Sequence, residues 1–397
     1  MLGGIFIVVI TGLLSFFIID ALKRQFPFID ASFLKRLFFV HLLLSLAYFG
    51  YVSFSPSDSR GYYLTARLAE DWFSLYGTST TFIKFLAYPF VQYFAFSYEA
   101  AMALFSFFGF IGFLFFYIFF KENIRFKHTF LGLDLLTLLF FLPNLHFWSA
   151  SLGKGSVILL GIGLFFFGLS NIQKRLVAIA VGGIIIYHVR PHIMLIILVS
   201  SAIGFVFSTQ SIKVIWKIMF LAAAVFAFIF IYQDVLTLVG IDEESFLTQG
   251  LDLTHRAREL SKATSGIDIS SYSLPMQVFT FLYRPLFFDA PGILGLIVSV
   301  ENVFYLLITL RLFGNLKGWR YIFFSGFLAK TALLSFIMVS VALAQVSGNL
   351  GLAIRQKSQV MILFLFVVIS FLDQQKLLEW RKAALRKQKV IKAQPTI

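Results

Sequence analysis

The chain has 397 residues, of which 59% are hydrophobic and 13% charged, and its formal net charge is +14. Soluble domains carry about 25% charged residues, so this composition excludes a soluble enzyme with one membrane anchor. Many of the 53 phenylalanines stand in runs such as 105–120, where all sides of a helix are apolar, as in lipid. The absence of cysteine excludes disulfides, zinc–thiolate sites and cysteine nucleophiles.

Eleven apolar segments approach the roughly 20 residues that a helix needs to cross a bilayer. They are 3–20, 37–55, 99–120, 130–145, 156–171, 176–188, 191–207, 214–232, 291–312, 321–344 and 359–372. The first lacks the basic n-region and cleavage site of a signal peptide, so we expect it to be retained. Pro191 divides the sixth segment from the seventh. The sequence therefore predicts an all-α, polytopic transmembrane bundle of about eleven spans, with one domain over 1–373 and a basic tail over 374–397.

Lysine and arginine collect on every second connection between these segments and in the tail. Because basic residues accumulate on the cytoplasmic side of membrane proteins, the net charge indicates orientation and not a nucleic-acid partner. With eleven spans, the N-terminus is outside and the tail is cytoplasmic. We expect a multi-pass protein of the plasma (inner) membrane, whose tail forms a basic helix on anionic lipid.

Two long outer loops follow from this topology, at 56–98 and 233–290. The first is predicted to begin with an interfacial helix whose apolar face carries Leu64, Leu68, Trp72 and Leu75. The segment 82–98 contains Pro89 and is predicted to enter the membrane without crossing it. In the second loop we expect a helix over 253–263 and an aromatic re-entrant piece over 279–288.

Polar residues on the outer side are few and stand at the ends of spans. They are Asp58, Arg60, Lys154, His188, Arg190, His192, Arg284, Arg355 and Lys357. Charges near membrane depth usually face a cavity or a partner, and arginine binds phosphate through two hydrogen bonds. We therefore expect an anion site for a phosphate or pyrophosphate headgroup, in one outer cavity shared by Asp58 and the arginines.

Each of these residues has a simpler interpretation. Asp58 is either a general base or metal ligand, or the N-cap of the helix that follows. His188 and His192 flank Arg190-Pro191 and bind phosphate, bind a metal or form a plain turn. Arg284 and Arg355 are phosphate ligands or cations that extend to the interface. The sequence assigns no cofactor and no metal ligand, and a divalent metal stays open as an alternative.

Lys154, Glu301 and Lys330 are candidates for other kinds of chemistry. Lys154 lies in a glycine-containing connection that lacks the spacing of a nucleotide P-loop and faces away from cytosolic ATP. Glu301 and Lys330 lie inside predicted spans. They form an intramembrane ion pair, or they couple transport to a proton or ion.

Two spans joined by a basic inner connection, followed by Asp58 and the aromatic pair Tyr62 and Tyr63, resemble the C-type (GT-C) membrane glycosyltransferases. The layout is also similar to that of bacterial exopolysaccharide polymerases of the EpsG-like and Wzy-like kind. The resemblance extends to the 149–154 connection, His188 and Arg355. The acidic pair found in the first loop of many GT-C enzymes is absent, since Ser59 follows Asp58.

This resemblance implies a donor sugar on polyprenyl phosphate or pyrophosphate and a glycan acceptor. Asp58 would be the catalytic base, and the substrate would be bound by Arg60, Tyr62, Lys154, His188, Arg190, His192, Arg284 and Arg355. The predicted function is polymerisation of surface polysaccharide at the outer face, with the bilayer and other envelope polysaccharide-assembly proteins as partners. The alternatives are a transporter or flippase for the same anionic substrates, and a non-catalytic scaffold for which substitutions of the outer arginines are neutral.

Overall fold

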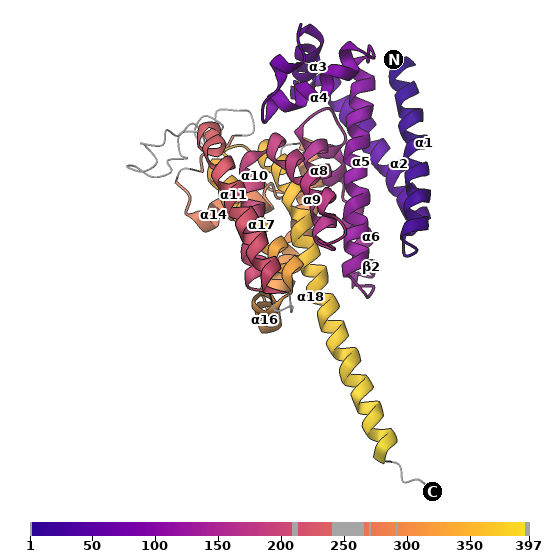
Figure 1. The fold of residues 1–397 in the computed structure, drawn as a ribbon, viewed down its shortest axis with the longest axis vertical. Helices are drawn as coiled ribbons and strands as arrows, with labels where there is room; N and C mark the ends of the chain where they lie inside the picture. Colours follow the sequence, from indigo (N-terminus) through magenta and orange to yellow (C-terminus); the bar gives the residue numbers. More distant parts are fainter. Residues whose placement is uncertain (1, 209–212, 240–265, 270, 291, 394–397) are drawn as a thin grey trace.

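The computed structural model describes residues 2–208, 213–239, 266–269, 271–290 and 292–393, and these residues are mainly helical (Figure 1). The helices are α1 (Leu2–Gln25), α2 (Ala31–Phe54), α3 (Asp58–Leu68), α4 (Thr80–Gln92), α5 (Tyr98–Asn123), α6 (Leu135–Phe140), α7 (Pro143–Ser149), α8 (Lys154–Leu169), α9 (Leu176–Val189), α10 (Pro191–Val206), α11 (Val214–Val239), α14 (Leu274–Tyr283), α15 (Gly292–Phe313), α16 (Leu316–Phe324), α17 (Phe327–Val346) and α18 (Leu350–Ala393). A short 3-10 turn covers Phe73–Leu75. The strands β1 (Thr129–Phe130) and β2 (Leu133–Asp134) form a small antiparallel hairpin.

Six of the described helices are long and apolar enough to cross a membrane: α1, α2, α5, α15, α17 and α18. Shorter apolar helices cover 135–149, 154–169, 176–189, 191–206, 217–231 and 274–283. The all-α class and the presence of apolar spanning helices are therefore confirmed. Most of the predicted segments lie on helices, and Pro191 separates α9 from α10 by standing at the start of α10.

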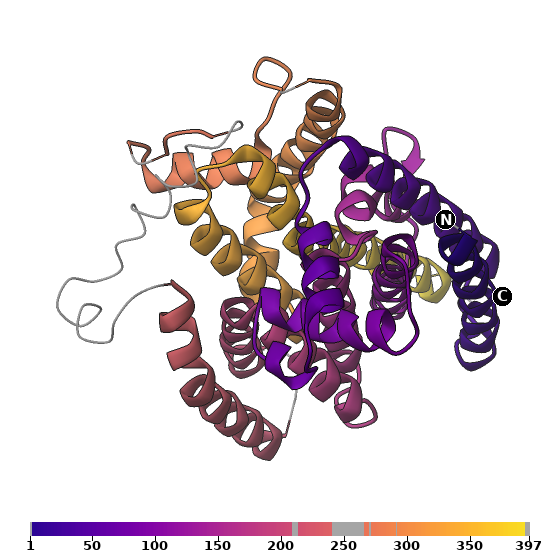
Figure 2. The same ribbon diagram turned by 90° about the horizontal axis from the view of Figure 1, so that it is seen from above.

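The helices pack in two neighbouring groups. On one side α5 contacts α1 and α8, and α8 contacts α9. On the other side α10 contacts α11 and α17, and α17 contacts α18. Seen from above, α1 and α11 lie near opposite edges of this arrangement (Figure 2). Close packing of α5 depends on glycine, because a Cβ on Gly112 would lie 2.8 Å from the backbone nitrogen of Leu160 in α8.

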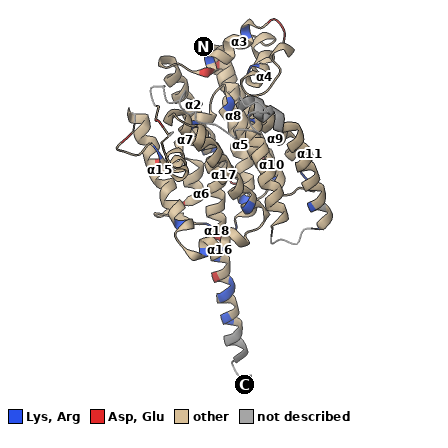
Figure 3. Cartoon of the chain, turned by 90° about the vertical axis from the view of Figure 1, so that its left-hand side faces the viewer, with Lys and Arg blue, Asp and Glu red and all other residues tan. Residues whose placement is uncertain are grey.

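Helix α18 passes through the body and continues beyond it. Residues 360–369 are all buried, whereas Leu378, Trp380 and Leu385 are exposed on the part that projects away (Figure 1). Lysine and arginine gather along this projecting part and near α16, and further cations lie at the opposite end near α3 and α4 (Figure 3). The basic tail is therefore a direct extension of a buried helix.

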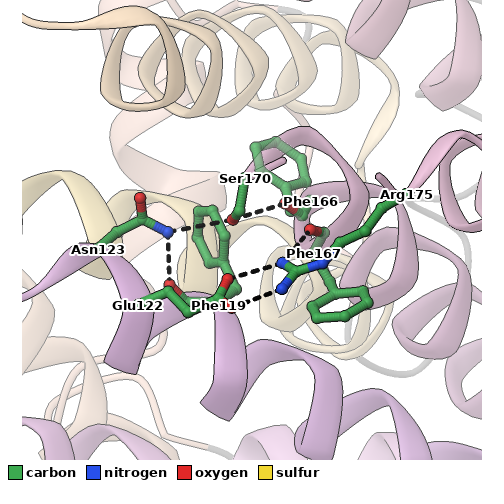
Figure 4. Close-up of polar contacts among 7 residues, drawn as sticks. All are labelled: Phe119, Glu122, Asn123, Phe166, Phe167, Ser170 and Arg175. Atoms are coloured by element: carbon green, nitrogen blue, oxygen red, sulfur yellow. Dashed lines mark hydrogen bonds and ion pairs between the residues drawn. The ribbon is translucent and has the colours of Figure 1, made fainter. Parts of the chain in front are cut away.

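One end of α5 is joined to the start of α9 by an ion pair with two hydrogen bonds (Figure 4). The Arg175 guanidinium donates to both carboxylate oxygens of Glu122, at 2.7 and 2.6 Å, and to the Phe167 carbonyl at 3.1 Å. The guanidinium also lies over the Phe167 ring, 3.9 Å from its centroid. Asn123 donates to Ser170 beside this pair. Arg175 is thus a structural cation as well as part of a basic connection.

Some predictions about the helices were wrong. Helix α3 ends at Leu68, so the expected single face reaching Trp72 and Leu75 is not formed. Its buried face carries Tyr62 and Ala66, whereas Leu64 and Leu68 are 51% and 78% exposed. Tyrosine has the larger ring to bury, and α4 and α5 pack on that side. The predicted helix over 253–263 lies outside the described residues.

The segment 130–145 is a second correction, because it is not one continuous helix. It is broken into α6 and α7 at Pro143, which stands at the start of α7. Proline is tolerated in the first turn of a helix but has no N–H to continue the preceding one. The break turns α7 towards α2 and α18, which both contact it.

Candidate functional site

Asp58 and Arg355 form an ion pair between residues 297 positions apart in the chain. The Arg355 Nη1 donates to the Asp58 Oδ2 over 2.9 Å. Asp58 is the first residue of α3, and the helix is capped by Ser57, whose hydroxyl accepts from the Ser59 N–H. Ser57 therefore fulfils the capping role that was an alternative for Asp58, and the carboxylate is turned towards α18. The expected proximity of Asp58 and Arg355 is confirmed.

Two aromatic side chains complete this site. The Arg355 guanidinium lies 5.9 Å from the centroid of the Trp148 ring, at the end of α7. The Tyr62 ring is 5% exposed, and Asp58, Arg355 and Arg190 all act on its phenol electrostatically. Burial and the negative charge of Asp58 raise the pKa of Tyr62, so the phenol is protonated at neutral pH. Arg190 itself is buried, where α9 meets α10.

The exposure of the ion pair leaves its charges accessible. The Asp58 side chain is 60% exposed and that of Arg355 is 21% exposed. An apolar cavity lies between α1, α2 and α5. Glu99 and His41 are among its lining residues, whereas Asp58 and Arg355 are not. Asp58 and Arg355 therefore share a surface site, and its location on the outer side stays a prediction. A solvent-accessible carboxylate can accept a proton, and the guanidinium beside it can bind an anion.

Lys154 and His188 meet at a second point, through Ser79. The Lys154 ammonium donates to the Ser79 hydroxyl over 2.7 Å, and the Ser79 N–H donates to the His188 carbonyl over 2.6 Å. The His188 Nε2 lies 2.9 Å from the Tyr76 hydroxyl, and the imidazole stacks on Phe82. Ser79 has a positive φ of 65°, which this double link holds in place.

The Asp58–Arg355 pair lies close to the contacts that Ser79 makes with Lys154 and His188. A Cβ on Gly153, the residue before Lys154, would lie 3.9 Å from the Tyr62 ring. Tyr62 therefore lies between the Asp58–Arg355 pair and the start of α8. Five of the predicted substrate-binding residues are consequently grouped around α3 and α4: Tyr62, Lys154, His188, Arg190 and Arg355.

Three other predicted residues are placed differently. The Arg284 Nε donates to Asp289, 2.5 Å away, within the same loop. Arg60 acts on the Tyr98 phenol at the start of α5. His192 is the second residue of α10 and is half-buried. The structure therefore gives Arg284 and Arg60 local partners in place of the Asp58 site.

Lys357 was expected on the outer face but is fully buried. Its ammonium donates to the Leu282 carbonyl, the Arg284 carbonyl and the Asn302 Oδ1, at 3.2, 3.0 and 2.7 Å. Three acceptors match its three N–H groups. Lys357 thus ties α18 to the loop after α14 and to α15.

The expected ion pair between Lys330 and Glu301 is not formed. Lys330 donates to the Phe207 and Phe323 carbonyls, which satisfies a cation in the first turn of α17. Glu301 is 4% exposed and accepts from the Asn144 N–H over 2.8 Å, while its Oε2 has no hydrogen-bond partner. Sequence spacing could not place Asn144 there, because the break before α7 sets its position.

The described residues contain no group of three or more histidine, aspartate or glutamate side chains that could hold a metal ion. No family model matches the chain, and comparisons with curated proteins and with solved structures gave no significant match. Interpretation of the site therefore depends on its own chemistry.

Proposed function

We propose that the protein is an integral membrane glycosyltransferase that uses polyprenyl-(pyro)phosphate-linked sugar donors at the outer face. Its role would be that of a polymerase in surface polysaccharide synthesis. The observation that supports this most is the accessible Asp58–Arg355 pair beside Tyr62 and Trp148. It offers a base and an anion-binding cation at one end of a body of apolar helices, where a lipid-linked substrate would present its headgroup.

In the proposed mechanism, the donor phosphate exchanges with Asp58 as the partner of Arg355. A phosphate offers several oxygens to the guanidinium, so the exchange keeps the cation paired. The acceptor hydroxyl oxygen then attacks the anomeric carbon, and its proton passes to the released Asp58 carboxylate. The bond from the anomeric carbon to the phosphate oxygen breaks, and the electron pair leaves with the lipid phosphate. Arg355 stabilises that growing negative charge.

The neighbouring cations have a supporting role in this proposal. Arg190 acts on Tyr62 from the α9–α10 junction, and Lys154 lies one residue beyond the glycine that meets the Tyr62 ring. A second phosphate of a pyrophosphate link would lie within the field of these cations. Lys154 donates to the neutral Ser79 hydroxyl, a contact that an anion can replace.

The experiment is sugar transfer by purified protein in liposomes that contain a polyprenyl-pyrophosphate-linked, radiolabelled oligosaccharide. Asp58→Asn should abolish lengthening of the glycan, whereas the matched variant Glu70→Gln should retain it. Glu70 is an exposed acid in the same outer segment. Normal polymer from the Asp58→Asn variant would remove the mechanism.

A transporter for the same lipid-linked saccharides is the second candidate, and the buried Glu301 favours it. A carboxylate oxygen without a partner at membrane depth is a feature of proton- and ion-coupled carriers. In the same liposomes, a transporter moves the labelled lipid across the bilayer without lengthening it. Glu301→Gln would then stop movement, while Asp58→Asn would not.

A further inference from the structure

Two histidines meet inside the helix bundle, away from the site described above. His41 of α2 is 2% exposed and His146 of α7 is fully buried. Their Nδ1 atoms lie 2.9 Å apart. The His41 Nε2 lies 2.9 Å from the Ser106 carbonyl oxygen, and the His146 Nε2 lies 2.7 Å from the Phe140 carbonyl oxygen. All four ring nitrogens are therefore in hydrogen-bonding contact.

The number of protons that these three contacts require can be compared with the number that two imidazoles carry. A carbonyl oxygen only accepts, so each Nε2 must carry a hydrogen to bond it. The contact between the two Nδ1 atoms needs a hydrogen of its own. Three contacts thus require three protons, whereas two neutral imidazoles carry two. With two protons, one pair of lone pairs must face each other at 2.9 Å or less, so that one of the three contacts is repulsive.

We propose that His41 and His146 form a buried binding site for a single proton, held between their Nδ1 atoms. The pair then carries one positive charge spread over two rings, and all three contacts are hydrogen bonds. The Phe113 ring stacks on His146 with centroids 4.2 Å apart and an angle of 19°, which places the negative face of an aromatic ring against the cation. Phe113 also meets the edge of His41.

The charged neighbours of the pair are few among the described residues. On the α5 side, His41 lines a cavity of about 420 Å³ between α1, α2 and α5, and Glu99 lines the same cavity. On the other side of α7, Glu301 bonds the Asn144 N–H, with Lys357 beyond it. The hydrogen bonds of Glu99, Glu301 and Lys357 go to groups other than these imidazoles.

This site gives the protein a definite dependence on pH. The folded chain binds one proton that two unfolded histidines release above their usual pKa of about 6.5. Stability therefore falls as the pH rises above about 6.5, by up to tenfold in the folding equilibrium constant per pH unit for one proton, whereas below that pH the unfolded chain holds more protons and the slope reverses. If both buried histidines were neutral, stability would instead rise with pH at low pH, because the unfolded chain would bind more protons than the folded one.

The first test is nuclear magnetic resonance of protein with 15N-labelled histidine in lipid nanodiscs at neutral pH. We expect both Nε2 atoms to be protonated, and one far-downfield proton shared between two Nδ1 atoms. That signal should vanish in both His41→Asn and His146→Asn. A neutral ring with a bare Nε2 at either position would overturn the proposal.

The second test measures the folded fraction against denaturing detergent from about pH 7 to about pH 9, above the usual pKa of histidine. In His41→Asn, the amide N–H takes the place of Nδ1 and donates to His146, so the third proton is no longer needed. This variant should lose the pH-dependent fall in stability, whereas the control His188→Asn should keep it. An unchanged slope in His41→Asn, or wild-type stability that rises with pH, would overturn the proposal.

Discussion

Removal of the Asp58–Arg355 ion pair separates its role in catalysis from any role in folding. The perturbation is a double-mutant cycle that comprises Asp58→Asn, Arg355→Gln and the double variant. Each substitution removes one charge; asparagine keeps the size of the aspartate side chain, and glutamine shortens that of arginine. Stability and sugar transfer are measured for all four proteins, so that the coupling free energy is known for both properties.

The exposure of the ion pair determines the coupling free energy that we expect between the two substitutions in unfolding. One hydrogen bond of 2.9 Å joins the pair, and the Asp58 side chain is 60% exposed to solvent. Exposed ion pairs contribute about 0.2–1 kcal/mol, because water screens the charges. We therefore expect a coupling of about 0.5 kcal/mol to the free energy of unfolding, so that each variant folds normally.

The expected effect on transfer is far larger. A positioned general base contributes about 10²–10⁴-fold to rate, which corresponds to roughly 3–5 kcal/mol of the barrier. Asp58→Asn should therefore lower the rate of glycan lengthening at least about 100-fold. Arg355→Gln should also raise the donor concentration needed for half-maximal rate, because a phosphate ligand is lost.

The assay combines the liposome transfer reaction with unfolding in denaturing detergent, followed by the fluorescence of Trp148 and the other tryptophans. Glu70→Gln serves as the charge-matched control in both measurements. The reasoning is refuted if Asp58→Asn unfolds with a loss above about 2 kcal/mol, since an exposed pair cannot supply that much. It is refuted equally if transfer falls only in proportion to the folded fraction.

Three further predictions concern the helix packing, and unfolding in denaturing detergent checks each of them. Gly109→Ala should destabilise the protein by about 1–3 kcal/mol because its Cβ meets the backbone of α7, whereas Gly50→Ala, with open space around it, should be neutral or stabilising. Glu122→Gln should cost about 2 kcal/mol because Arg175 loses a charged partner that is 19% exposed, and a cost near zero would show that the pair is solvated. Lys357→Met should cost more than about 3 kcal/mol, since it leaves three buried acceptors without a donor, and a stable variant would contradict that role.

Much of the fold was predictable because long apolar stretches determine where helices form. The segments expected around Pro191 match α9 and α10, since proline ends one helix and begins another. The length of α3 was not predictable in the same way. The apolar face expected over Leu64, Leu68, Trp72 and Leu75 stops where the helix ends at Leu68, and packing against the body buries Tyr62.

The site was predictable where chain position alone brings residues together. Asp58 follows the second predicted span and Arg355 precedes the last one, so the predicted topology places both on the same side, and the structure joins them in an ion pair. Lys357 and the His41–His146 pair were not predictable, because their partners come from helices far apart in sequence. A lone lysine or histidine in an apolar stretch indicates that a partner exists without identifying it.

The location of Asp58 on the outer side of the membrane is what the proposed transfer depends on. The absence of cysteine allows a direct measurement, because a single introduced thiol is the only one in the chain. Glu70→Cys and Arg381→Cys are each exposed to a membrane-impermeant maleimide on intact cells. We predict that position 70 is labelled at once and that position 381 is labelled only after the cells are opened. Labelling of position 381 on intact cells, with position 70 protected, would place Asp58 in the cytoplasm and contradict the account.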